Sequence, residues 1–347
     1  MPGFDSIIGQ KHPIRLLKRF LRNGTLPHAL LFTGIEGVGK RTAAAEIAMA
    51  LNCADPQADK KSRRDPSQAC GTCPPCRQIR SNNHPDIITV TPHNNLLRID
   101  QIRKLIHALA MKPFSARHRV VIIAKAQTMN PEAANALLKI LEEPPQQTTL
   151  ILTAPHRSEL LPTIVSRCRR IAFEPLASED LQILLADKLG ADKKRAQIIV
   201  AMAGGSYAKA RMLADDTWQY QRSWILRAAG LDAPGELNHR PATEALAFSA
   251  QLAQHKDNVM DLLDMLKTWI RDLSIHPYQP GRIINRDRKD LIGAIRSDMD
   301  EHRLLDLWDA VEKAQKDIAA RANLRLTLDV MALRMAGLTD GPKRRNE

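Results

Sequence analysis

A glycine-rich segment near the start of the chain has the composition and spacing of a loop that binds phosphate. Its sequence GIEGVGK at 34–40 fits the first seven positions of the phosphate-loop (P-loop) pattern, with Gly34, Gly37, Gly39 and Lys40 as candidate contact residues. Glycines let backbone N–H groups curl around phosphate oxygens, and the lysine ammonium reaches the terminal phosphates. The alternative is a glycine-rich turn between a strand and a helix that holds no ligand.

The positions that would capture magnesium depart from this pattern. Arg41 stands where a hydroxyl normally binds the ion, and Thr42 comes one residue late on a different face of the helix. Ala124 and Lys125 follow the apolar run 120–123, where nucleotide hydrolases carry acidic residues for the metal and the attacking water. Losing both contributions lowers a hydrolysis rate by about a thousandfold or more. The sequence therefore predicts no ATP hydrolysis, and it leaves open whether ATP binds or side chains fill the loop.

Four of the five cysteines, Cys53, Cys70, Cys73 and Cys76, fall in one polar segment, whereas Cys168 stands alone. The two-residue gaps let consecutive sulfurs converge on one tetrahedral ion, and four sulfur ligands leave no open position for water or substrate. Because the chain begins without an apolar export signal, this clustering favours structural Zn²⁺ over disulfides. The alternative is four unpaired thiols, which would be reactive in an exposed loop.

The segments around these motifs predict an α/β domain followed by helices. Short apolar runs that fit buried strands lie at 28–32, 87–90, 120–123 and 149–153. Amphipathic segments separate these runs, so a parallel sheet with crossover helices is expected. Beyond Pro175 helical patterns take over, and the clearest apolar stripe runs from Val259 to Leu273.

Chain length and net charge limit the classes of protein to which the sequence can belong. With 347 residues the chain is long enough for about two or three domains, and its formal net charge of +13 suits work beside a polyanion such as DNA. A basic surface without any nucleic-acid partner fits the charge equally well. The basic residues between Cys53 and Cys70 fit a solvated loop better than a nucleic-acid contact: Lys60, Lys61, Arg63 and Arg64. No apolar run long enough for a membrane span is present, so a cytoplasmic location is expected.

With these motifs the chain resembles the delta-prime family of bacterial DNA polymerase III clamp-loader subunits, AAA+ relatives of the gamma/tau subunits. The resemblance covers nearly the whole chain. Besides the P-loop and the cysteine module, it rests on these segments: Ile8-Gly9-Gln10, PHALLF at 27–32, His84-Pro85-Asp86, ANALLKILEEPP at 134–145 and Ser166-Arg167-Cys168.

The resemblance implies a domain plan and a set of partners. It implies a RecA-like AAA+ domain at 1–174 with a zinc-binding insertion at 53–76, a helical lid at 175–215 and an all-α collar at 216–347. Such a subunit has no intrinsic catalysis, although it belongs to the DNA polymerase III holoenzyme, a nucleotidyltransferase assembly. The implied partners are gamma/tau and delta subunits in a hetero-pentamer, the sliding clamp and primed DNA.

The resemblance also assigns a role to Arg167. In the family, the arginine of the Ser-Arg-Cys element reaches ATP bound by a neighbouring gamma/tau subunit, and a guanidinium inserted in trans can neutralise charge on a transferring phosphoryl group. Without the family, this arginine would be interpreted as a surface ion-pair partner. Two alternative functions remain open: an active gamma/tau-type ATPase, and a zinc-dependent DNA-binding module independent of the polymerase.

Overall fold

The computed structural model describes residues 3–54, 65–93, 96–189, 193–235, 240–256 and 258–338. The basic residues of the cysteine insertion at 60–64 lie outside this described part. The chain divides into two compact units, the first comprising Met1–Leu184 with Gly204–Lys209 and the second Leu185–Ala203 with Ala210–Glu347. The domain limits expected at 174 and 215 stay predictions.

The first unit is built on a parallel sheet, as the alternating strand and helix patterns predict. Its order is β2-β3-β4-β1-β5, so β1 lies between β4 and β5. The strands are β1 (Ala29–Thr33), β2 (Ile87–Val90), β3 (Arg119–Ile123), β4 (Thr148–Ala154) and β5 (Arg169–Ala172). Four of them match the predicted runs, whereas β5 was not predicted. Because β5 exposes three of its four side chains, its sequence has no apolar run to reveal it.

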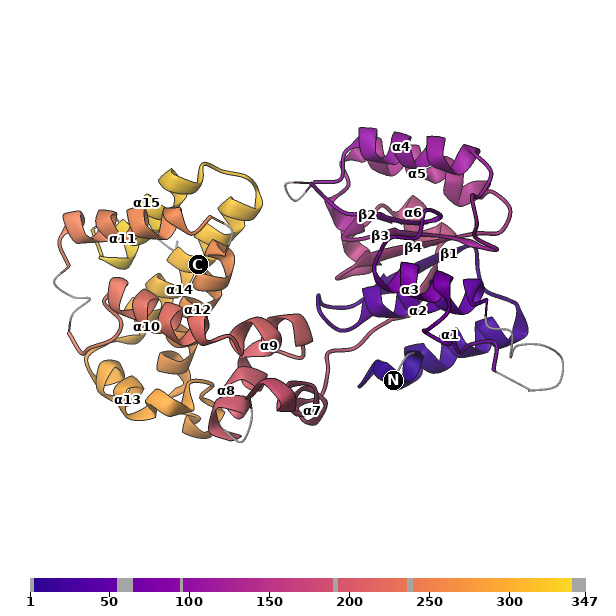
Figure 1. The fold of residues 1–347 in the computed structure, drawn as a ribbon. Coiled ribbons are helices and arrows are strands. Elements are labelled where there is room, and N and C mark those ends of the chain that lie inside the picture. The colour runs from indigo at the N-terminus through magenta and orange to yellow at the C-terminus, as the bar shows by residue number, and fades with distance from the viewer. Residues whose placement is uncertain are drawn as a thin grey trace. The chain divides into compact units, whose positions relative to one another are not determined.

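Helices cover both faces of this sheet (Figure 1). Alternate side chains of β1 point to opposite faces: Leu30 and Phe32 pack with α1, α2 and α3, whereas Ala29 and Leu31 pack with α4, α5 and α6. The helices of the first unit are η1 (Phe4–Ser6), α1 (Lys11–Asn23), α2 (Lys40–Asn52), α3 (Pro74–Arg80), α4 (Ile99–Ala110), η3 (Ala126–Thr128), α5 (Pro131–Glu142), η4 (Arg157–Glu159) and α6 (Pro162–Arg167). Helix α7 (Ser178–Leu189) begins in this unit and ends in the second.

Among its described residues the second unit consists of helices and the loops between them, as expected. Its elements are α8 (Lys193–Ala203), the end of α9 (Tyr207–Leu213), which begins in the first unit, α10 (Asp216–Ala228), α11 (Ala242–Gln254), α12 (Val259–Ile275), η6 (Pro280–Arg282), η7 (Arg286–Arg288), α13 (Lys289–Ser297), α14 (Glu301–Ala319) and α15 (Leu324–Met335). The predicted apolar stripe from Val259 to Leu273 is the buried face of α12. This helix packs against α10, α13 and α14, and α15 packs against α11 and α14.

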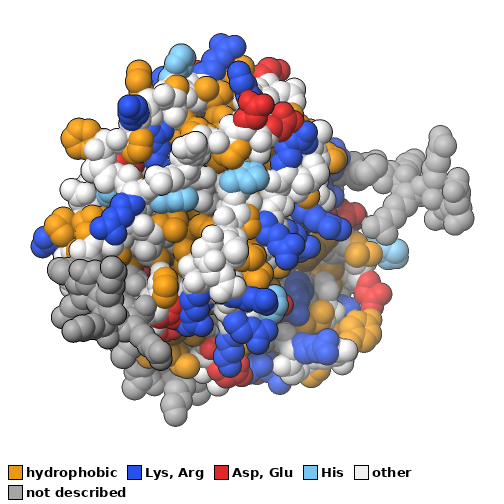
Figure 2. Space-filling model, turned by 90° about the vertical axis from the view of Figure 1, so that its right-hand side faces the viewer, with side chains coloured by type: hydrophobic (Ala, Val, Ile, Leu, Met, Phe, Trp, Pro, Cys, Tyr) orange, Lys and Arg blue, Asp and Glu red, His pale blue; other side chains and the backbone are white. Residues whose placement is uncertain are grey.

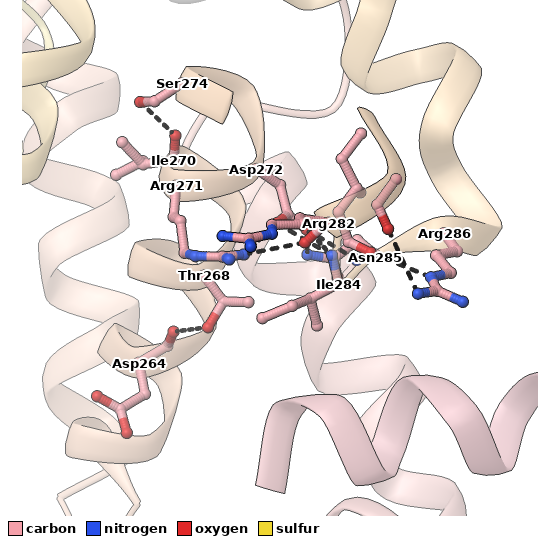
Figure 3. Close-up of polar contacts among 12 residues, drawn as sticks. Asp264, Thr268, Ile270, Arg271, Asp272, Ser274, Arg282, Ile284, Asn285 and Arg286 are labelled. Carbon is pink, nitrogen blue, oxygen red and sulfur yellow. Dashed lines mark hydrogen bonds and ion pairs between the residues drawn. The ribbon is translucent and has the colours of Figure 1, made fainter. Parts of the chain in front are cut away.

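A buried carboxylate fixes the loop after α12 (Figure 3). Asp272 is fully buried and accepts hydrogen bonds from the backbone N–H groups of Ile284 and Asn285, at 3.0 and 2.7 Å, and from the Asn285 side chain at 2.7 Å. Arg271 Nη1 lies 3.0 Å from the same carboxylate. A buried charge is tolerated when it is surrounded by donors in this way, so these contacts are structural.

Basic side chains are prominent on the surface. On the face drawn in Figure 2, Lys and Arg are spread widely and Asp and Glu are sparser, in keeping with the net charge of +13. Among the described helices, none has the length and apolar character needed to span a membrane.

Candidate functional sites

The P-loop connects the end of β1 to the start of α2, the arrangement that its sequence predicts. Two of its glycines are required by close approach of other backbone. A Cβ on Gly34 would lie 2.3 Å from the carbonyl oxygen of Phe173, and one on Gly37 would lie 2.7 Å from the backbone nitrogen of Ala208. Both residues also have positive φ, which favours glycine. The loop is therefore held between Phe173, which directly follows β5, and the start of α9.

A cavity of about 520 Å³ opens beside this loop, a size ordinary for small-molecule sites. The structure brings most of the predicted nucleotide residues to its wall: Gly37, Gly39, Lys40, Arg41 and Thr42. Gly34 shapes the loop but does not line the cavity. Ala124 and Lys125, which follow β3, also line the cavity. The two positions where nucleotide hydrolases carry acidic residues therefore lie beside the P-loop, as the sequence predicts.

Lys40 is folded back onto its own loop. Its side chain is largely buried, and Nζ donates hydrogen bonds to the carbonyl oxygens of Gly34 and, at 2.8 Å, Ile35. Burial lowers the pKa of Lys40 to about 8; Glu36 opposes this shift and Lys125 adds to it. The ammonium is thus held by backbone carbonyls of the P-loop, and burial raises the free energy of its charged form.

Lys125 pairs with the P-loop. Its Nζ lies 2.9 Å from Oε1 of Glu36, which is the only carboxylate among the residues that line the cavity. The backbone at Lys125 has a φ of 53°, and its N–H donates to Oγ1 of Thr153 at 3.1 Å. A cation therefore stands where hydrolases place an acidic residue.

Three features of this cavity were not predicted from the sequence. They are the Glu36–Lys125 ion pair, the hydroxyl of Thr153, and the cover formed by Tyr207 and Ala208, where the N–H of Tyr207 donates to the carbonyl of Gly37 at 3.1 Å. Thr153 could have been suggested by its position at the carboxyl end of a predicted strand beside β1. The other two join residues far apart in the chain, and no local pattern marks them.

The four clustered cysteines converge. The Sγ atoms of Cys53, Cys70, Cys73 and Cys76 all lie within 4.8 Å of one another, so the group could hold a metal ion. Helix α3 begins directly after Cys73 and contains Cys76, while Cys53 follows α2. Burial tends to raise the pKa of Cys70, but hydrogen bonds from the backbone of Cys73 and from the side chain and backbone of Thr72 outweigh it and lower that pKa to about 6. Burial raises the pKa of Cys76 instead, so the surroundings favour a thiolate at Cys70 and a thiol at Cys76 when no metal is bound.

Arg167 is the last residue of α6 and forms an ion pair within its own chain. Its Nε donates to Oε1 of Glu142 at 2.9 Å, and its Nη1 donates to the carbonyl of Thr163 at 3.0 Å. Both charged side chains are partly exposed, so the pair contributes only about 0–1 kcal/mol to stability. The ion-pair interpretation and a role toward a neighbouring subunit are therefore compatible, because the guanidinium can leave Glu142 at little cost.

The His84-Pro85-Asp86 motif organises a loop away from the cavity. Asp86 accepts backbone hydrogen bonds from Phe114 at 2.9 Å and from Ser115 and Ala116 at 2.8 Å. Burial opposes its ionisation, but these N–H groups outweigh burial and lower the pKa of Asp86. The motif is structural in these contacts.

The strand order β2-β3-β4-β1-β5, with a P-loop after β1, gives the first unit the fold of an AAA+ domain. The family described as "DNA polymerase III, delta subunit" matches residues 9–177. Together with the relatives below, this match shows that the chain is similar to subunits of DNA polymerase III.

Three curated relatives illustrate the similarity. DNA polymerase III subunit delta' of Pseudomonas aeruginosa is 34% identical over 57% of this chain and 59% of its own length. Subunit delta' of Bacillus subtilis is 26% identical over 93% of this chain and 95% of its own. Subunit tau of Bacillus subtilis is 28% identical over 80% of this chain, which spans only 51% of that protein.

Similarity to solved structures is weaker. A Thermotoga maritima protein described as related to the DNA polymerase III gamma subunit aligns over 93% of this chain and 98% of its own, at 17% identity and a TM-score of 0.43. A score this low carries no argument about function.

Proposed function

We propose that the chain is a delta-prime-type clamp-loader subunit that does not hydrolyse ATP and that helps to load a sliding clamp onto primed DNA. The observation that carries this proposal is the wall of the P-loop cavity. Ala124 and Lys125 occupy the acidic positions, and the single lining carboxylate, Glu36, is paired with Lys125 at 2.9 Å. The relatives named delta' support the choice over gamma/tau, although subunits named tau match as well.

The lack of hydrolysis follows from the chemistry of phosphoryl transfer. The reaction depends on a metal that neutralises developing charge and on a group that orients the attacking water. Arg41 and Lys125 would repel a divalent cation, and neither can accept a proton from water. The expected cost is about a thousandfold or more in rate.

ATP turnover by the purified full chain, measured with magnesium and without partners, tests this proposal. The expected rate is at the background of the assay, and a gamma/tau subunit measured in parallel serves as the positive control. Brisk turnover by the chain alone would contradict the proposal and favour the gamma/tau-type ATPase. Tight DNA binding by the chain alone that a chelator abolishes would instead favour the zinc-dependent DNA-binding module.

Within the assembly, the proposed role of Arg167 is to act in trans. Its partly exposed pair with Glu142 can open at little cost, and a guanidinium can form bidentate, charge-assisted contacts with a phosphoryl group. The partners in this proposal are gamma/tau and delta subunits in a hetero-pentamer. The second unit would supply the collar through which they assemble.

The proposed content of the cysteine cluster is one structural Zn²⁺. Four sulfurs within 4.8 Å suit tetrahedral zinc, and a closed set of four thiolates leaves no position for a reacting water. Helix α3 is short, so a metal that ties it to the end of α2 would add to the stability of this corner of the domain.

A further inference from the structure

The P-loop cavity is strongly cationic. Lys40, Arg41 and Lys125 line it, and Glu36 is the single acidic residue in its wall. Lys40 and Lys125 lie close enough for repulsion between them to lower the pKa of Lys40. A cluster of like charges around a cavity favours an anion as its occupant.

The Glu36–Lys125 pair does not block such an occupant. The two side chains are 71% and 42% exposed, so the pair is well solvated and contributes little to stability. Lys40 is likewise held only by two carbonyls of its own loop. Phosphate oxygens can replace both sets of partners with stronger, charge-assisted hydrogen bonds.

The charge supplied by the wall resembles what a metal supplies elsewhere. In a P-loop site with magnesium, a divalent cation held by a hydroxyl and a carboxylate neutralises the phosphates. Here Arg41 occupies the hydroxyl position and Lys125 one of the acidic positions, so two positive charges belong to the protein itself. A divalent cation entering beside them would meet repulsion and would find no free carboxylate in the wall.

We infer that this cavity binds the phosphate chain of a nucleoside di- or triphosphate without a divalent cation, with Arg41 and Lys125 supplying the charge that magnesium supplies in related sites. The inference rests on the proposed function in one respect, since both take the site to lack a catalytic metal. Lys40 then moves from the carbonyls of Gly34 and Ile35 to the phosphates, and Lys125 moves away from Glu36.

Calorimetric titration of the full chain with ATP, once in EDTA and once in magnesium, tests this inference. The affinity in EDTA should equal or exceed that in magnesium. Lys125→Ala should weaken binding in EDTA by about tenfold, which corresponds to about 1.4 kcal/mol for one lost charge contact. Lys125→Arg, which keeps the charge, should restore most of it. Lys104→Ala on the exposed face of α4 is the matched control and should bind as the unmodified chain does.

Tripolyphosphate, titrated in parallel, shows whether the nucleoside adds to the affinity. Three results would overturn the inference: binding more than tenfold weaker in EDTA than in magnesium, equal affinities for Lys125→Ala and Lys104→Ala, or no binding of ATP, ADP or tripolyphosphate at millimolar concentration. Turnover measured on the same samples separates the two proposals. Magnesium-dependent turnover contradicts the proposed function, whereas magnesium-dependent binding without turnover contradicts only this inference.

Discussion

Two lysines decide what the P-loop cavity can do. Lys125 adds a cation at a position where hydrolases use an acid, and Lys40 is buried against carbonyls with a pKa lowered to about 8. Burying the Lys40 ammonium without a full counter-charge lowers the free energy of unfolding of the protein without ligand. A stability measurement can therefore detect this effect.

Lys40→Met should therefore stabilise the first unit at pH 7 in phosphate-free buffer, by about 1–3 kcal/mol. Because the folded pKa lies below the unfolded value of 10.5, the unfolded chain binds more protons between pH 8 and 10.5. The cost of the charged lysine is present in full below pH 8 and shrinks as the pH rises. The gain of the variant should accordingly narrow by pH 9.5.

Hydrogen exchange of the β1 amides measures this, because β1 is paired on both sides, with β4 and β5, and its amides are expected to open with the unit. Arg103→Met on α4, where the side chain is exposed, is the control and should leave exchange unchanged. A variant at Lys40 that loses stability at pH 7 would show that the buried ammonium does not carry the cost described above.

At the scale of elements, the strands and motifs that depend on a local pattern of residues could be predicted from the sequence. Strands β1 and β3 are apolar runs, and the spacing of Cys70, Cys73 and Cys76 already favoured convergence of their sulfurs. Strand β5 stayed hidden because its exposed arginines resemble a loop, although it pairs with β1. The Glu36–Lys125 pair stayed hidden because tertiary folding alone brings its partners together.

The loop after α12 depends on Asp272. Asp272→Asn should destabilise the second unit by about 2–4 kcal/mol, because an amide in place of the carboxylate presents donors to the N–H groups of Ile284 or Asn285. The tryptophans all lie in this unit, so their fluorescence during denaturation reports on it. Asp298→Asn, at an exposed position, should leave the transition in place. Equal transitions for the two variants would refute a structural role for Asp272.

The four clustered cysteines at the end of α2 and in and before α3 lead to a prediction of the metal content of the chain. Chain purified without chelators should contain about one zinc ion per molecule by elemental analysis, and Cys73→Ser should lose most of it because three sulfurs bind zinc far more weakly than four. Cys168→Ser is the matched control, since this partly buried thiol lies apart from the cluster, and the zinc content of this variant should be unchanged. Absence of zinc from the unmodified chain would contradict the assignment.

At the scale of the whole molecule, an AAA+ unit and a helical unit are joined in a chain that is similar to subunits of DNA polymerase III. Under the proposed function, the chain contributes to a clamp loader by geometry and charge and not by hydrolysis. Its net charge of +13 suits an assembly that works beside DNA, and its partly exposed arginine at the end of α6 suits an edge presented to a neighbour. The functional effect of Arg167 is therefore expected in another subunit.

The most direct test is the DNA-stimulated ATPase of a loader reconstituted with gamma/tau, delta, clamp and primed DNA, comparing the unmodified chain with Arg167→Ala. Turnover should fall by about tenfold or more, with this chain still folded and still assembled, because an arginine acting in trans is worth at least that much. Arg103→Ala should leave turnover unchanged. Full turnover by the loader that carries Arg167→Ala would contradict a role of Arg167 in trans.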